Sequence, residues 1–327
     1  MKAWRVGVLG EPRDVMSLDE VAIPTPGATQ VLVRVLAAAA NFPDVLICRG
    51  EYQMKPDLPF TPGFEVCGEV IANGAQVEGL AVGDRVIGLC ALPAGGYAEY
   101  ALTDAASTFP APPALNDAEA AALFIGYQTG WFALHRRAHL QAGETLLVHA
   151  AAGGVGSAAV QLGKAAGARV IGVVGNAQKA LVARELGADI VIDRSSEDFV
   201  DIVKTATNGR GADVIFDPVG GDTYQRSTKC IAFEGRILLI GFAGGQIQSA
   251  PLNHALIKNY SIVGLHWGLY LEKDPASIRA CHDELTRLTD IGVVRPLVTE
   301  RLALADVADG LQRLGAGSTA GRLAYVS

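Results

Sequence analysis

A run of small residues has the spacing needed to hold a phosphate group. Ala151, Gly153 and Gly156 follow the form of a dinucleotide fingerprint, with Ala in place of its first Gly. The middle Gly lets the backbone approach a pyrophosphate, and the last lets a helix pack closely on a strand. Gly154 and Val155 lie between them, at the start of a helix whose N–H groups attract an anion. The alternative is a Gly-rich loop that binds nothing.

The flanking residues supply the strand, turn, helix and strand that this fingerprint requires. A β-rich apolar run over 145–149 precedes the turn, and apolar residues at helical spacing follow over 157–166. Gly167 provides a left-handed cap for that helix, and the next strand is expected over 169–174. This context favours dinucleotide binding over an unliganded loop.

The segment after the second strand indicates which dinucleotide is bound. An NAD site usually carries Asp or Glu there to hold the ribose 2′-hydroxyl, but Gly175, Asn176 and Lys179 occur here without an acid. Lys179 falls in the first turn of a helix, where a positive charge opposes the macrodipole unless an anion binds nearby. Arg194, after the third strand, is a second candidate partner for a 2′-phosphate. We therefore expect NADPH; the alternative is that Lys179 and Arg194 are ordinary solvated charges.

Composition narrows the classes of protein. The chain has 327 residues, half of them apolar, and a formal net charge of -7. This length suits two domains, and the charge gives no general attraction to nucleic acid. The five cysteines show no metal-ligand spacing, and no apolar run is long enough to cross a membrane. We expect a soluble cytoplasmic protein with no nucleic-acid or membrane partner.

The pattern of expected strands and helices changes twice along the chain. Residues 1–125 are rich in short strands and turn signals, which predicts a β-rich domain of irregular barrel type. Residues 126–264 alternate strands with helices, which predicts a doubly wound parallel sheet of Rossmann type. Two helical runs follow, 276–291 and 305–314, and the final strand, 322–326, suits the first domain better than the sheet. The dinucleotide domain, 126–264, is therefore expected to be inserted in a domain built from 1–125 and 265–327.

At this point the sequence resembles the medium-chain dehydrogenase/reductase superfamily, and within it the zinc-free quinone oxidoreductases related to ζ-crystallin. The resemblance covers the whole chain. Its carriers are the segments 40–44, 58–63, 82–86, 149–156, 175–179 and 217–221, together with Tyr52 and Thr129.

The resemblance implies a GroES-like first domain and a set of cofactor contacts. It places Asn41 near the nicotinamide ribose, Thr129 on the nicotinamide side and 153–156 on the pyrophosphate. Gly175, Asn176, Lys179 and Arg194 would surround the 2′-phosphate. Further contacts on the nicotinamide side would come from the loops after the fifth and sixth strands, namely Gly241, Phe242, Leu265, His266 and Trp267. Asn41 and Thr129 could equally be satisfied turn or cap residues.

Departures from the zinc-dependent relatives matter for the chemistry. Those relatives have Gly-His-Glu where this chain has Gly63-Phe64-Glu65, and a metal-ligand Cys near the place of Asn41. Catalytic zinc needs three protein ligands, so no metal site is expected. Asn41, Asp44 and Tyr52 are the candidate catalytic residues. Tyr52 is the better proton donor by type, although it could also be a hydrogen-bonding rim residue.

Three functions remain open. Without a Lewis acid, the chain suits an acceptor already activated by conjugation, which favours an NADPH-dependent quinone oxidoreductase. The second is reduction of an enoyl thioester or small enone, for which Lys55, Arg136 and Arg137 would be the basic patch. The third is a non-catalytic NADPH-binding protein. The family pairs the last strand of the nucleotide-binding sheet across a two-fold axis, so a homodimer is expected.

Overall fold

The alternating strands and helices of the second half form one parallel sheet. The computed structural model describes all 327 residues, and they divide into unit 1, residues 1–125 and 274–327, and unit 2, residues 126–273. Each unit has its own hydrophobic core. No helix in either unit combines the length and the apolar character needed to cross a bilayer.

Unit 2 contains a six-stranded parallel sheet in the order β12-β11-β10-β7-β8-β9. Its strands, in chain order, are β7 (Thr145–His149), β8 (Arg169–Val174), β9 (Ile190–Asp193), β10 (Ala212–Asp217), β11 (Ile231–Leu239) and β12 (Ser261–Gly264). The chain runs from the centre to one edge and then restarts beside β7. The strand order therefore reverses between β7 and β10, where doubly wound folds bind their ligands.

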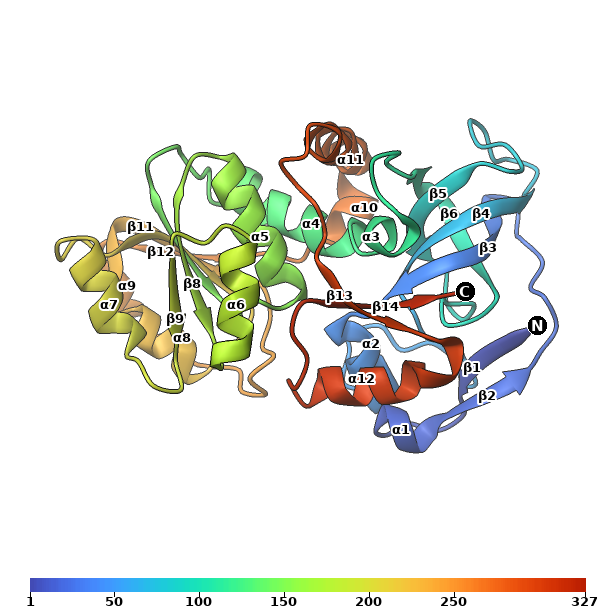
Figure 1. Cartoon of the computed structure of the whole chain (residues 1–327), viewed down its shortest axis with the longest axis horizontal. Coiled ribbons are helices and arrows are strands. Elements are labelled where there is room, and N and C mark those ends of the chain that lie inside the picture. The colour runs from blue at the N-terminus through green and yellow to red at the C-terminus, as the bar shows by residue number, and fades with distance from the viewer. The chain divides into compact units, whose positions relative to one another are not determined.

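Helices cover both faces of this sheet (Figure 1). The helices of unit 2 are α4 (Phe124–Trp131, which begins in unit 1), a π-helix (Phe132–Arg137), α5 (Gly154–Ala165), α6 (Ala177–Glu185), α7 (Phe199–Ala206), α8 (Asp222–Ser227), α9 (Leu252–Lys258) and α10 (Leu269–Lys273). The α5 and α6 helices pack on β7, β8 and β9, and α8 packs on β10.

Unit 1 is built on a six-stranded sheet in the order β13-β14-β3-β4-β5-β6, which partly closes because β3 also pairs with β6. The strands are β3 (Gln30–Ala39), β4 (Glu65–Asn73), β5 (Arg85–Cys90), β6 (Tyr100–Pro110), β13 (Val298–Leu302) and β14 (Arg322–Val326). A separate hairpin joins β1 (Lys2–Val6) to β2 (Met16–Glu20). The C-terminal strand β14 thus lies beside β3, in the sheet that the N-terminal part of the chain forms (Figure 1).

Six helical segments complete unit 1. They are α1 (Pro12–Val15), α2 (Phe42–Arg49), α3 (Asp117–Ala121), α11 (Pro275–Asp290), a 3-10 turn (Leu304–Asp306) and α12 (Val307–Gly315). The α12 helix packs on α1 and α2, so chain segments from both ends of the sequence share one core.

The expected fold class, a parallel Rossmann sheet together with a GroES-like β-rich domain, is confirmed. Several element boundaries differ from expectation by a few residues. The α5 helix begins at Gly154 rather than at residue 157, and α11 and α12 are each displaced by one or two residues from the expected runs 276–291 and 305–314. The β11 strand begins at Ile231, five residues before the strand that the sequence predicts over 236–240. The early start of β11 includes an irregularity, because Glu234 has a φ of 58° and the register with β10 shifts there.

The segment 265–273 belongs to unit 2, whereas the sequence assigned it to the β-rich domain. Side chains of this segment pack against α4 and the π-helix that follows it. The rings of Tyr270 and Phe132 lie 4.3 Å apart, and Trp267 Nε1 donates to Gln128 Oε1 at 3.2 Å.

Candidate functional site

The turn after β7 leaves a helix N-terminus open. The N-cap of α5 is Gly153, which has no side chain to accept the first N–H groups of the helix. Gly156 is required by close packing, because a Cβ there would lie 2.1 Å from the carbonyl oxygen of Ala150. The backbone from Gly153 to Val155 is partly exposed. An uncapped helix of this length offers its N–H groups and its dipole to an anion such as a pyrophosphate.

Ala151 replaces the first Gly of the fingerprint without strain because of a glycine on the next strand. Ala151 is fully buried, and a Cβ placed on Gly172 of β8 would lie 2.9 Å from the Ala151 Cβ. The missing side chain of Gly172 therefore makes room for the methyl group of Ala151. Spacing alone could not reveal this compensation, since it depends on strand pairing.

A pair of cations lies at the end of β8. Asn176 caps α6 by accepting the Lys179 backbone N–H at 2.9 Å. The Arg194 side chain passes close to Gly175, where a Cβ would lie 3.9 Å from Arg194 Nε. Burial lowers the pKa of Lys179, and the positive charge of Arg194 lowers it further. The four residues predicted around a 2′-phosphate are thus brought together, and a dianion there would offset the repulsion between the two cations.

Two loops and one helix form the other end of the predicted cofactor site. Thr129 of α4 is almost fully buried, and its neighbour Gln128 accepts the Trp267 N–H. Gly241 and Phe242 follow β11, and Phe242 is about one-third exposed, with a relative accessibility of 38%. Leu265 is half-buried just after β12. The structure therefore places Thr129 close to the loop that carries Leu265 and Trp267, all within unit 2.

Asp217 shapes this end of the sheet, a role that the sequence did not assign. It ends β10, is fully buried, and its Oδ1 accepts the N–H groups of Val219 and Gly220 at 2.8 and 3.0 Å. A Cβ on Gly220 would lie 2.8 Å from a ring carbon of Phe242. Asp217 thus fixes the turn on which Phe242 packs. The only signal was an acid followed by Pro-Val-Gly-Gly directly after a predicted strand.

The candidate catalytic residues lie in unit 1, where Asp44 is the most deeply buried. Its Oδ1 accepts the N–H groups of Gly63 and Phe64 at 3.2 and 3.1 Å. Its Oδ2 accepts the Asn41 N–H and the Tyr97 hydroxyl at 2.8 and 2.9 Å. No part of Asp44 is exposed. The expectation that Asp44 acts on the substrate is therefore replaced by a proposal that it anchors the turn at 63–64.

Asn41 also has most of its hydrogen-bonding capacity committed within unit 1. Its Nδ2 donates to Glu65 Oε1 at 2.9 Å and to the Ala39 carbonyl at 3.2 Å, and its Oδ1 accepts from Arg322 at 3.1 Å. One acceptor position of Oδ1 remains for a ligand. We propose that Asn41 is chiefly a positioning residue, in place of the predicted direct role in catalysis.

Tyr52 is the remaining candidate for proton transfer. Its side chain is half-buried, and its ring lies edge-on to Phe64 with centroids 5.6 Å apart. Burial raises the pKa of its phenol, and the Asp44 carboxylate raises it further. The hydroxyl is therefore protonated at neutral pH and could donate a proton to a reduced acceptor.

Comparison with known proteins places these features in a family. The model of the alcohol dehydrogenase GroES-like domain matches residues 27–113, and that of zinc-binding dehydrogenases matches residues 154–285. The quinone oxidoreductase-like protein 2 homolog of Nematostella vectensis is 40% identical over 308 residues, covering 94% of this chain and 83% of that protein. This chain belongs to the quinone oxidoreductases of the medium-chain dehydrogenase/reductase superfamily.

Solved structures of this superfamily match over the full length. The Escherichia coli quinone oxidoreductase complexed with NADPH has a TM-score of 0.92 and 30% identity, with 100% of both chains covered. The CurK enoyl reductase has a TM-score of 0.88 and 25% identity, covering 99% of this chain and 98% of that one.

One of the matching family models is that of zinc-binding dehydrogenases, but the residues of this quinone oxidoreductase do not fit a zinc ion. At the positions of two ligands stand Phe64, whose ring packs against Tyr52, and Asn41, whose amide is held in the buried network. No three His, Cys, Asp or Glu side chains gather where they could hold a metal ion. The donor atoms that zinc requires are therefore missing.

We expect the purified protein to contain no stoichiometric zinc, because Phe64 offers no donor atom. Metal analysis by plasma mass spectrometry checks this, and treatment with a chelator should leave the rate of NADPH oxidation unchanged. About one zinc per chain would contradict this expectation.

The buried carboxyl of Asp44 makes the stability of the protein depend on pH. Burial raises its pKa from 3.8 to about 7, against the hydrogen bonds from Asn41 and Tyr97, which lower it. The folded state then binds more protons than the unfolded state between these two values. The resulting stabilisation is complete below about pH 4 and is lost as the pH rises to about 7.

We therefore expect the free energy of unfolding to fall by a few kcal/mol between pH 5 and 8 because of Asp44. Urea unfolding of the wild type and of Asp44→Asn at several pH values measures this decrease, and the variant should lack the Asp44 part of it. Infrared difference spectroscopy should show a protonated carboxyl band at pH 5 that fades by pH 8. The absence of this band at pH 5 would overturn the assignment.

Proposed function

We propose that this protein is an NADPH-dependent quinone oxidoreductase that works without a metal ion. The observation that carries the proposal is the pairing of Lys179 and Arg194 beside the uncapped N-terminus of α5, with no carboxylate at 175–176. A cofactor with a pyrophosphate and a 2′-phosphate matches both features. The E. coli relative described above was solved with NADPH.

The cofactor contacts follow from the geometry of unit 2. Ala151 and the backbone at 153–156 would hold the pyrophosphate, and Gly175, Asn176, Lys179 and Arg194 would hold the 2′-phosphate. Thr129, Gly241, Phe242, Leu265 and Trp267 would line the nicotinamide side. Bound NADPH supplies a hydride, and the chain contributes position, orientation and exclusion of water.

The kind of hydride acceptor follows from the lack of metal ligands in unit 1. With Phe64 and Asn41 at the two ligand positions, the chain offers no Lewis acid to polarise a simple carbonyl. A quinone is already activated by conjugation. It takes up the hydride to give the hydroquinone anion, and one proton, which the Tyr52 hydroxyl or water would donate, then gives the neutral hydroquinone. Asn41 and Asp44 would hold the surrounding turns in place.

A second candidate is reduction of a conjugated double bond in an enoyl thioester or enone. The CurK neighbour is an enoyl reductase, and Arg137 lies beside a cavity of unit 2 that could accept an anionic group. Arg136 packs over the ring of Tyr270 at 5.0 Å and Lys55 is exposed in unit 1. Of the three residues predicted as a basic patch, Arg137 is the one that lines this cavity.

Steady-state NADPH oxidation with panels of small quinones and enoyl-CoA thioesters tests the function. The quinones should be reduced fastest. An advantage of a hundredfold in kcat/KM for an enoyl-CoA would replace the first function by the second. Tight NADPH binding with no reduction in either panel would leave the binding-protein hypothesis.

The exposed edge of the unit 2 sheet supports a homodimer. The β12 strand pairs with β11 on one side only, and it carries no Pro or charged residue to guard the other. Leu252, Leu256 and Ile257 of the neighbouring α9 are each more than 70% exposed. A bare apolar edge of this kind invites pairing with another chain.

We therefore expect a dimer in solution at micromolar concentration, measured by multi-angle light scattering. Ile262→Lys, which puts a charge on the edge strand, should shift the mass towards the monomer. A monomer mass for the wild type would contradict the proposal.

The five cysteines are free and buried. Unpaired thiols of this kind suit a reducing compartment, and we propose a cytoplasmic location. Fractionation of the producing cells tests it.

A further inference from the structure

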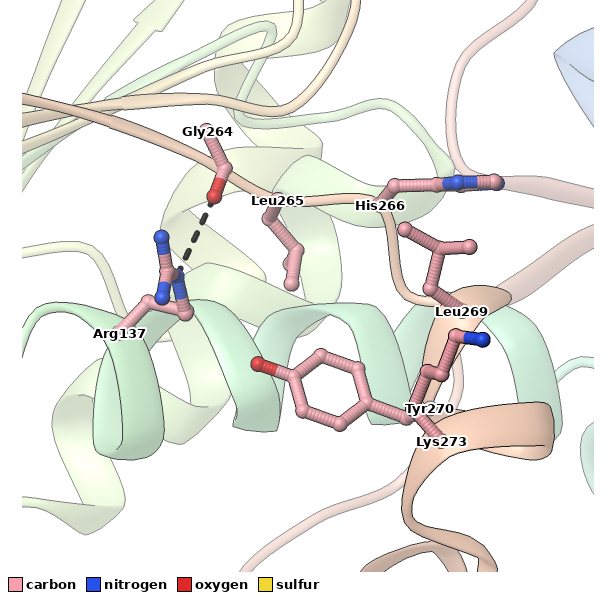
Figure 2. A pocket seen from close by; sticks show the side chains of 7 residues that line it. All are labelled: Arg137, Gly264, Leu265, His266, Leu269, Tyr270 and Lys273. Atoms are coloured by element: carbon pink, nitrogen blue, oxygen red, sulfur yellow. Dashed lines mark hydrogen bonds between the residues drawn. The ribbon is translucent and has the colours of Figure 1, made fainter.

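Unit 2 contains a small cavity, and among the residues that line it only Leu265 is a cofactor contact proposed above (Figure 2). It has a volume of about 290 Å³ and lies between the end of the π-helix and the segment from β12 to α10. Arg137, His266 and Lys273 line it together with Leu265, Leu269 and Tyr270. Its size is at the lower end of the range for small-molecule sites.

The charges around this cavity have one sign. Two of its lining side chains are the basic residues Arg137 and Lys273, and no carboxylate lines it. Glu272, the chain neighbour of Lys273, pairs with it on the surface, with both side chains 70% exposed. Exposed pairs of this kind contribute little and are readily exchanged. The protein as a whole is acidic, with a net charge of -7, so this local excess of positive charge runs against its composition.

The walls of the cavity are apolar and partly fixed. The Tyr270 ring lies 4.3 Å from the Phe132 ring, and the Arg136 guanidinium lies over it at 5.0 Å. The Tyr270 hydroxyl points toward the Arg137 end of the cavity, while His266 and Lys273 lie at the other end (Figure 2). Arg137 Nε donates to the Gly264 carbonyl at 3.2 Å, which orients the guanidinium. Its two terminal amino groups have further N–H donors.

We propose that this cavity binds a small organic anion with an apolar body, held by Arg137 and Lys273 and packed on Leu269 and Tyr270. The apolar body would lie against the wall of Leu269 and the aromatic ring, and the anionic group would lie near a guanidinium or ammonium. A neutral molecule of the same shape would lose the charge-assisted hydrogen bonds, which are the stronger class. This inference does not depend on the identity of the acceptor.

Calorimetry with 2-naphthoate and with its neutral isostere 2-naphthamide tests the proposal. The full chain is used with saturating NADP, so that the cations of the cofactor site are occupied. We expect naphthoate to bind at least about tenfold more tightly than the amide, the factor for roughly 1.4 kcal/mol of charge-assisted bonding. Inorganic phosphate alone should bind more weakly than naphthoate, because it lacks the apolar body.

Three variants locate the site. Arg137→Gln and Lys273→Gln should each weaken naphthoate by roughly tenfold with little effect on the amide, and Leu269→Asn should weaken both ligands. Lys229→Gln, an exposed lysine of unit 2 that does not line the cavity, is the matched control and should change nothing. Thermal unfolding confirms that each variant is folded.

The inhibition pattern shows whether the cavity is part of the acceptor site or a separate effector site. Competition between naphthoate and the acceptor would make the cavity part of the acceptor site, and inhibition without competition would make it a separate effector site. Both results support the proposal. Equal binding of naphthoate and naphthamide, or equal losses in the cavity variants and in Lys229→Gln, would overturn it while leaving the oxidoreductase activity intact.

Discussion

Replacement of Arg322 by Met is expected to lower the free energy of unfolding by about 3–5 kcal/mol. Arg322 is 2% exposed and forms an ion pair with the fully buried Glu65. Burial raises the pKa of Glu65, whereas Arg322, the Ile125 N–H and Asn41 favour its charged form. Without Arg322, the Glu65 carboxylate would remain buried with no opposing charge, and Asn41 would lose its guanidinium donor.

The loss of stability in Arg322→Met can be compared with the loss caused by breaking an exposed ion pair in the same sheet. Arg34 and Glu69 join β3 to β4 at 2.5 Å, with side chains 45% and 37% exposed, so Arg34→Met should cost at most about 1 kcal/mol. A double variant, Arg322→Met with Glu65→Gln, should be more stable than Arg322→Met alone, because the unpaired charge is gone. Urea unfolding followed by tryptophan fluorescence measures all three. Similar small losses for Arg322→Met and Arg34→Met would contradict the argument.

Lys179→Ala and Arg194→Ala are each expected to weaken NADPH binding by roughly 1–3 kcal/mol, the range of a hydrogen bond to a charged group. Burial and the neighbouring Arg194 lower the pKa of Lys179, and a bound 2′-phosphate would relieve that repulsion. NADH has no such phosphate, so its affinity should hardly change. The ratio of the two affinities therefore isolates the phosphate contact.

Titration of the wild type and both variants with NADPH and NADH, followed by cofactor fluorescence, measures this ratio. Lys229→Ala removes an exposed lysine of the same unit and should leave both affinities unchanged. Equal losses for NADPH and NADH in Lys179→Ala would mean that Lys179 supports the fold of α6 rather than reading the phosphate.

The cofactor contacts proposed for unit 2 could be inferred from the sequence because their residues lie within one stretch of the chain. Gly153 and Gly156 follow β7 directly, and Asn176 and Lys179 open the helix after β8. Each of these positions is set by a local rule: a glycine where the backbone must come close, and a cap where a helix begins. Alternation of strand and helix then dictates a parallel sheet, because parallel strands need crossover connections.

The surroundings of the candidate catalytic residues in unit 1 were less predictable because their contacts join distant parts of the chain. Asn41, Glu65 and Arg322 meet although the Glu65 and Arg322 partners are separated by 257 residues. From sequence alone, Asn41 and Asp44 were polar residues near a family motif, and their burial was not visible. The structure shows that partners from β4, β14 and the 63–64 turn use most of their hydrogen-bonding capacity.

By itself, the sequence determined the dinucleotide fold and predicted Lys179 and Arg194 as partners for a 2′-phosphate, since short-range spacing specifies helix termini and strand ends. It also determined that Phe64 cannot bind zinc, which follows from side-chain chemistry alone. Only the tertiary structure decided that Asp44 is an anchor, that Gly172 makes room for Ala151, and that Arg137 lines a cavity with Lys273. These three depend on which side chains become neighbours when strands and helices far apart in the chain pack together, and no local pattern encodes that.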